Sequence, residues 1–167
     1  MNPKQIFASF MARDATHHDI HAHLLRLAQW GQDYAEQAET AALRAEAQAI
    51  ERFFTSTAHE HHQDEEKNVF PLLLNSEQSA EVVQALKTLQ QDHHWIELNW
   101  REIAPMIRAI ADGEDWVEPS ELQHGIEVFV NLCLDHITLE ETLIYPEAKH
   151  QLAAQLAART SQQAPMV

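Results

Sequence analysis

Two segments of the chain repeat one pattern of histidine, glutamate and proline. Aligned without gaps, the first is His61-x-x-x-Glu65-Glu66-x-x-Val69-Phe70-Pro71, and the second is His136-x-x-x-Glu140-Glu141-x-x-Ile144-Tyr145-Pro146, which begins 75 residues later. A shorter match precedes each segment: His17-His18-Asp19-Ile20 corresponds to His93-His94-Trp95-Ile96, 76 residues apart. Because the two offsets nearly agree, the chain is predicted to contain two copies of a helix pair, placed about a pseudo-twofold axis in a four-helix bundle.

The apolar residues recur at helical spacing, with no tract of strict alternation, so the chain is predicted to form four long helices. Their expected ranges are 13–39, 40–74, 80–112 and 120–150, with bends at Pro71 and Pro105. Three glycines and six prolines in 167 residues are too few for a turn-rich β fold. The expected fold is all-α, an up-down-up-down four-helix bundle over residues 1–159 with a polar C-terminal tail at 160–167.

The charge of the chain restricts its partners. Eleven Lys and Arg residues stand against 26 Asp and Glu residues, a formal net charge of −15. Such a chain has no basic face with which to bind nucleic acid or an anionic membrane surface. No apolar stretch reaches the length of a signal peptide or a membrane span, and Cys133 has no second cysteine with which to pair. We therefore expect a cytoplasmic protein.

The His-x-x-x-Glu motif suits metal binding, because residues four apart on a helix lie on one face and can reach the same site. His17 and His93 fall in register with apolar residues of their own helices, which turns them toward the bundle interior. Any one of these histidines alone is more often an ordinary core or surface residue. The residues expected to meet in the interior are His17, His61, Glu65, His93, His136 and Glu140. Six such groups in an apolar core need cations to offset their desolvation, and a metal cluster supplies them.

The neighbours of these residues are expected to lie off the inner face. Glu66 and Glu141 follow their histidines by five positions, which predicts either solvated charges or hydrogen-bond partners of the ligands. His18, His62 and His94 stand one step from the inner face and are expected at the surface or in similar contacts with ligands. Four further histidines are also expected off this face: His23, His59, His124 and His150.

Over about residues 10–150 these motifs resemble the hemerythrin family, specifically the bacterial hemerythrin-like or HHE cation-binding domains. The resemblance implies a non-haem di-iron centre with a solvent-derived bridge between the two iron ions. The ligands it implies are His17 from the first helix, His61 and Glu65 from the second, His93 from the third, and His136 and Glu140 from the fourth. In this arrangement Glu65 and Glu140 are the bridging carboxylates.

The chain departs from the oxygen-carrying hemerythrins at one position. Those proteins carry a fifth histidine one turn after the first on the third helix, where this chain has Glu97. Two residues are candidates to complete the centre: His21, one turn after His17, or Glu97 as an oxygen ligand. We expect His21, because it shares a helix face with His17 and Leu24 and would otherwise be an unpaired buried imidazole. A centre richer in carboxylate would favour the ferric state.

The function implied by the resemblance is binding of O₂, or of NO or peroxide, for sensing, storage or oxidative and nitrosative defence. An apolar pocket walled by Ile20, Trp100 and Phe129 would limit the entry of water. Three alternatives stay open: a di-iron oxidase or peroxidase, an iron storage or homeostasis protein whose acidic surface assists cation entry, and a helical module with structural metal. Because nothing outside the centre identifies an organic substrate, the sequence favours binding over catalysis. It leaves open the choice of iron, zinc or manganese and the oligomeric state.

Overall fold

The computed structural model describes residues 3–36, 40–75 and 78–162, with side chains described from residue 11 to residue 158 outside the same gaps. Every element in these ranges is helical. The elements are α1 (Pro3–Glu36), α2 (Ala41–Phe53), η1 (Phe54–Ala58), α3 (His59–Asp64), η2 (Glu65–Val69), α4 (Phe70–Leu74), α5 (Ala80–Asp112), α6 (Pro119–Leu139), η3 (Glu140–Ile144) and α7 (Tyr145–Gln162), where η denotes a π-helical segment.

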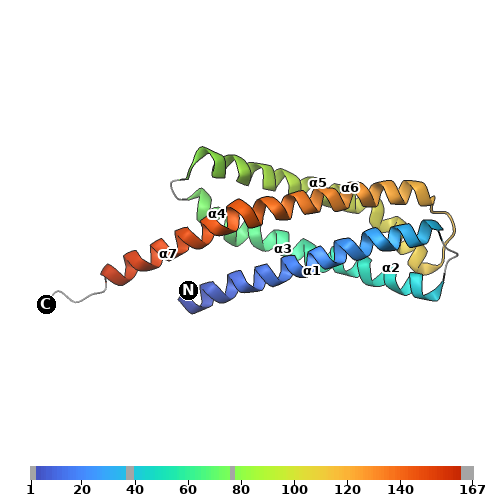
Figure 1. The fold of residues 1–167 in the computed structure, drawn as a ribbon, viewed down its shortest axis with the longest axis horizontal. Coiled ribbons are helices and arrows are strands. Elements are labelled where there is room, and N and C mark those ends of the chain that lie inside the picture. The colour runs from blue at the N-terminus through green and yellow to red at the C-terminus, as the bar shows by residue number, and fades with distance from the viewer. Residues whose placement is uncertain (1–2, 37–39, 76–77, 163–167) are drawn as a thin grey trace.

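These elements form four long helical runs that alternate in direction (Figure 1). The first run is α1, the second extends from α2 to α4, the third is α5, and the fourth extends from α6 to α7. α1 packs against α2 and α6, and α5 packs against the same two elements, so the runs close into a ring of four. The predicted all-α, up-down-up-down bundle is confirmed for the described residues.

Local capping explains where the helices begin and end. The Thr40 side chain accepts a hydrogen bond from the Leu43 amide at 3.1 Å, and the Ser79 side chain accepts one from the Val82 amide at 3.2 Å. These bonds satisfy amides that have no partner within the first turn of a helix. At the end of α5, Gly113 adopts the left-handed conformation with φ of 79°, which costs glycine little.

Two of the π-helical segments belong to the sequence repeat. η2 begins at Glu65 and η3 begins at Glu140, and in each the first carbonyl accepts the amide hydrogen of the residue five positions later. Pro71 and Pro146 each follow their segment by two residues. A proline ring lacks an amide donor and clashes with the preceding turn of an α-helix. The wider turn before each proline accommodates this conflict, so the helical run continues where a bend was expected at Pro71.

Several expected boundaries were wrong. α1 begins at Pro3, ten residues before the expected start, because no helix-breaking residue separates the amphipathic part from the sequence before it. The fourth run continues to Gln162, so the first three residues of the expected tail at 160–167 are helical, and the rest of that tail lies outside the described residues. α5 covers 80–112 as expected and passes through Pro105 without interruption. Within the described ranges, no helix is both long and apolar enough to cross a bilayer.

The apolar core consists of two clusters separated by a layer of buried polar side chains. The larger cluster includes Leu24, Ile50 and Phe129, and the smaller one includes Phe70 and Leu86. On the second, third and fourth runs, apolar core residues precede and follow the predicted ligands in sequence, whereas on α1 the described apolar core residues all follow His17. The two clusters therefore enclose the polar layer from both ends of the bundle.

Candidate metal centre

The six residues predicted to meet in the interior do so. Their ligand atoms form two overlapping groups, within each of which all atoms lie within 4.8 Å of one another. One group is His17, His61, Glu65 and Glu140, and the other is Glu65, His93, His136 and Glu140. All six side chains are buried. Glu65 and Glu140 belong to both groups, which is the arrangement that two carboxylates bridging two metal ions would have.

The sequence repeat explains how the site is assembled. Within each motif, the histidine Nε2 lies 3.3 Å from an oxygen of the glutamate four residues later, in His61 with Glu65 and in His136 with Glu140. The lone histidines reach across the repeat. His17 Nε2 lies 3.2 Å from Glu140 Oε2, and His93 Nε2 lies 3.5 Å from Glu65 Oε2. Each half of the bundle thus contributes to both ends of the centre.

The second glutamate of each motif orients a histidine of the other half. Glu141 Oε1 lies 3.2 Å from His17 Nδ1, and Glu66 Oε1 lies 3.0 Å from His93 Nδ1. A hydrogen bond at Nδ1 fixes the tautomer and turns Nε2 toward a metal. Of the two roles that the sequence left open for these glutamates, the structure supports contact with a ligand.

Replacing Glu66 or Glu141 with Gln is expected to weaken metal binding by roughly 10–100-fold without lowering the number of ions bound at saturation, because the amide holds the imidazole less firmly. Competition against a chelator of known affinity measures this effect. Glu127→Gln, an exposed glutamate on α6, is the control. Unchanged affinity in both variants would show that these contacts do not orient the ligands.

The two halves differ at the aromatic residue before the proline. The Phe70 ring stacks on His93 with ring centroids 5.5 Å apart, and the Tyr145 ring stacks on His17 at 4.9 Å. The Tyr145 hydroxyl also donates a hydrogen bond to Glu65 Oε1 and lies 3.2 Å from His17 Nε2. Burial and the nearby Glu65 charge raise the pKa of this phenol, so it keeps its proton. In the sequence, Tyr145 is only the aromatic position of the repeat that corresponds to Phe70, and its hydroxyl is the one difference that could have indicated this contact.

The charges in the centre call for cations. Burial raises the pKa of Glu65, but hydrogen bonds from His17 and His93 outweigh burial and lower that pKa well below its usual range. Burial lowers the pKa of His17, and contacts with Glu140 and Glu65 raise it to about 10. Burial also lowers the pKa of His136, which Asp92 and Glu140 raise to about 9. Protons on these two imidazoles occupy the place that metal ions would take.

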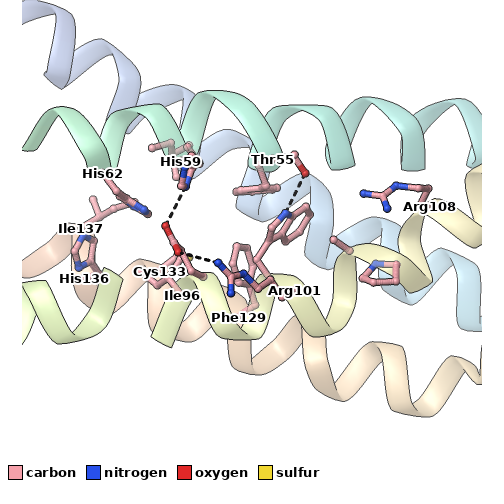
Figure 2. Close-up of a pocket in the computed structure, with 17 residues that line it drawn as sticks. Thr55, His59, His62, Ile96, Arg101, Arg108, Phe129, Cys133, His136 and Ile137 are labelled. Carbon is pink, nitrogen blue, oxygen red and sulfur yellow. Dashed lines mark hydrogen bonds and ion pairs between the residues drawn. The ribbon is translucent and has the colours of Figure 1, made fainter. Parts of the chain in front are cut away.

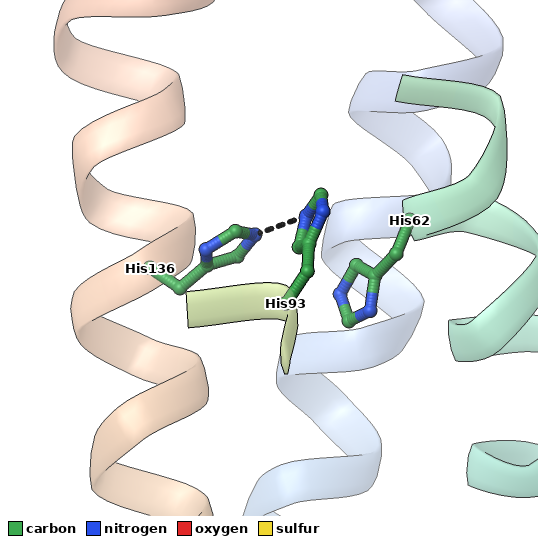
Figure 3. A group of neighbouring side chains, drawn as sticks. All are labelled: His62, His93 and His136. Atoms are coloured by element: carbon green, nitrogen blue, oxygen red, sulfur yellow. Dashed lines mark hydrogen bonds between the residues drawn. The ribbon is translucent and has the colours of Figure 1, made fainter. Parts of the chain in front are cut away.

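The donor atoms also fit a metal. Five buried atoms of these six residues have no hydrogen bond of regular geometry, although histidine nitrogens lie close to the carboxylate oxygens: His61 Nε2, Glu65 Oε2, His136 Nδ1, Glu140 Oε1 and Glu140 Oε2. Buried carboxylate oxygens and imidazole nitrogens that lack regular hydrogen bonds are costly unless something else binds them. His93 Nε2 and His136 Nε2 face one another at 3.1 Å (Figure 3). Imidazole with carboxylate is a donor set that suits iron, zinc and manganese.

The structure does not bring His21 into the centre. Its side chain is exposed, although that of His17 is almost fully buried. Glu97 also lies apart from both ligand groups, with Oε1 at 3.0 Å from His59 Nδ1. α1 is uninterrupted here, and Ile20 rather than His21 occupies the inner face. The expectation that His21 completes the centre is therefore not supported by its position.

His62 takes the inner position instead. It is buried and forms a third group of ligand atoms with His93 and His136 (Figure 3). The His62 ring stacks on His93 with centroids 4.4 Å apart. Burial lowers the pKa of His62 well below its usual value, which leaves a neutral imidazole with a free lone pair. The sequence placed this residue at the surface or beside a ligand, and the surface placement was wrong.

A cavity of about 380 Å³ opens beside the centre (Figure 2). His62 and His136 stand at its inner end, and Ile20, Trp100 and Phe129 are among the residues that line it. The three residues predicted to wall an apolar pocket therefore do so. The exposed residues of its lining are Thr55 on η1 and Arg101, Pro105 and Arg108 on α5, so the cavity opens to the surface between η1 and α5.

The chain belongs to the hemerythrin HHE cation binding domain family, which it matches over residues 12–148. This match covers every residue of the two ligand groups, and it agrees with the family resemblance of the sequence motifs. No curated protein and no solved structure matches the chain closely. The buried His and Glu groups of this cation-binding domain are able to hold metal ions.

Proposed function

We propose that this chain is a cytoplasmic, non-haem di-iron protein that binds O₂, or a related small ligand such as NO or peroxide. The observation that carries the proposal is the sharing of Glu65 and Glu140 by two groups of buried ligand atoms. A single metal ion does not require two carboxylates that each belong to two groups of ligand atoms, whereas two ions bridged by carboxylates require this arrangement. The arrangement supports a dinuclear centre, the family match supports a bound cation, and the resemblance of the motifs to hemerythrins implies iron.

The proposed ligands divide between two positions. His17 and His61 hold the first ion, and His93, His136 and His62 hold the second. Glu65 and Glu140 bridge the two positions, since each has oxygens close to histidines of both groups. His62 then takes the part of the fifth histidine that the sequence sought at position 21. The two positions would differ in the number of nitrogen ligands, which favours one of them for an exogenous ligand.

The remaining residues of the site protect and tune the proposed centre. Two iron ions, when bound, supply the electrons that a diatomic ligand needs. Glu66 and Glu141 hold the imidazoles of His93 and His17 in place. Tyr145 keeps its proton and donates it in a hydrogen bond to Glu65 Oε1, which holds that carboxylate in position. Apolar side chains of the neighbouring cavity limit water near the centre, which slows irreversible oxidation.

Protein purified without oxygen tests the proposal through its metal content and optical spectrum, recorded before air, in air and after air is removed. We expect about two irons per chain and a charge-transfer band that appears with O₂ and fades when O₂ is removed. Irreversible conversion to the ferric form would favour an oxidase, a peroxidase or an iron storage protein. Bound zinc, or one ion per chain, would contradict the di-iron proposal.

A further inference from the structure

The cavity beside the metal centre is much larger than a diatomic ligand requires. Its volume is about 380 Å³, whereas one water molecule occupies about 30 Å³ in the liquid. Pockets that bind small organic molecules begin at roughly 300 Å³. The cavity therefore has the size of a site for an organic molecule, a conclusion that does not depend on which metal the centre holds.

The lining of the cavity changes in character from its inner end to its mouth (Figure 2). The middle is apolar and includes Ile96, Phe129 and the buried Cys133. The mouth carries Arg101 and Arg108, both on α5. An occupant that matches this order has an apolar body and one polar end that faces outward.

The two arginines determine the charge of that polar end. They are seven residues apart, two turns of α5, and Ala104 and Pro105 stand between them on the lining. Both are exposed, at 74% for Arg101 and 56% for Arg108. The chain has a net charge of −15, so two arginines at one cavity mouth differ from its prevailing negative charge. Such guanidinium groups recognise carboxylates through charge-assisted hydrogen bonds.

The acidic neighbours of these arginines use only some of their N–H donors. Glu97 Oε2 lies 3.7 Å from Arg101, while its other oxygen lies 3.0 Å from His59. Glu51 Oε1 lies 2.5 Å from Arg108 Nη2. A guanidinium has five N–H donors, so both arginines can bind a further anion. Glu97 is the charge that such an anion would have to displace or share.

We propose that this cavity binds a small amphipathic organic acid, with its apolar part against Ile96 and Phe129 and its carboxylate at Arg101 and Arg108. The apolar end of the molecule then points toward His62 and His136. This site gives the protein an organic ligand next to its metal centre, in addition to the small ligand proposed above.

Calorimetric titration of the purified full chain with decanoate, decanol and decyltrimethylammonium tests the proposal. Decanoate is expected to bind roughly tenfold more tightly than decanol, and the cation to bind least. Arg101→Gln should remove most of that preference, whereas Glu97→Gln should increase the affinity for decanoate because it removes the competing charge. Ala104→Met, which narrows the cavity, should weaken the binding of decanoate and decanol together.

The single cysteine reports where the ligand binds. Cys133 lines the cavity, so decanoate should slow its reaction with methyl methanethiosulfonate, measured by mass spectrometry. Equal affinity for decanoate and decanol would overturn the assignment of an acid, and binding without protection of Cys133 would place the ligand elsewhere. Metal content is measured in the same samples. If the purified protein bound decanoate but contained no iron, the organic-acid site would be supported and only the di-iron proposal would be contradicted.

Discussion

Glu65→Gln and Glu140→Gln are each expected to lower the metal content from about two ions per chain to fewer than one. Each of these carboxylates belongs to both ligand groups, so its loss affects both positions. An amide also places an N–H donor where a cation should bind. Metal analysis after equilibrium dialysis against iron and against zinc measures the change.

Glu60→Gln is the matched control for these variants, because Glu60 is exposed on α3 next to His61 and is in neither ligand group. It should bind as much metal as the unchanged protein. Circular dichroism establishes that the three variants remain helical. If Glu65→Gln or Glu140→Gln still bound two ions, the carboxylates would not be bridges.

His62→Phe is expected to weaken the binding of one of the two ions by roughly 100-fold, about 3 kcal/mol, and to leave the other nearly unchanged. Phenylalanine preserves the ring in the buried space but offers no ligand atom. His62 groups with His93 and His136, so the affected ion is the one beside the cavity. A stepwise metal titration that resolves two affinities measures the effect.

The comparison with His21 makes this result decisive. His21→Gln changes an exposed side chain and should leave both affinities unchanged. Glu97→Gln should do the same, since Glu97 contacts His59 and Arg101 rather than the ligand groups. Loss of an ion from His21→Gln, with none from His62→Phe, would restore the ligand set expected from the sequence.

The repeat in the sequence determined the fold and most of the centre. Two motifs with the same spacing required two equivalent helix pairs, and the bundle has them. Within each motif, the four-residue spacing placed His61 beside Glu65 and His136 beside Glu140, because neighbours at this spacing share a helix face. Apolar residues in register with His17 and His93 were enough to turn these two inward.

Only the tertiary structure decided which further histidine lies buried beside the two ligand groups. A step of four residues advances an α-helix by about 40° beyond a full turn. In the uninterrupted α1, this step carries His21 away from the face of His17 and into solvent. In the second run, Phe54, Ala58 and His62 are also spaced four residues apart. The wider π-helical turn of η1 cancels the rotation of about 40° that each such step adds in a regular α-helix, and all three side chains are buried.

The same distinction applies to Glu97 and the cavity. Glu97 follows His93 by four residues in the regular α5, so it rotates from the ligand groups to the cavity mouth, where it meets His59 of α3. The sequence named three walls of the cavity, since their apolar side chains follow helical spacing. Its volume, and the placement of Arg101 and Arg108 at its mouth, depend on how α3, α5 and α6 pack together. Spacing along one helix determines which residues share a helix face, but the packing between helices determines which residues of other helices that face contacts.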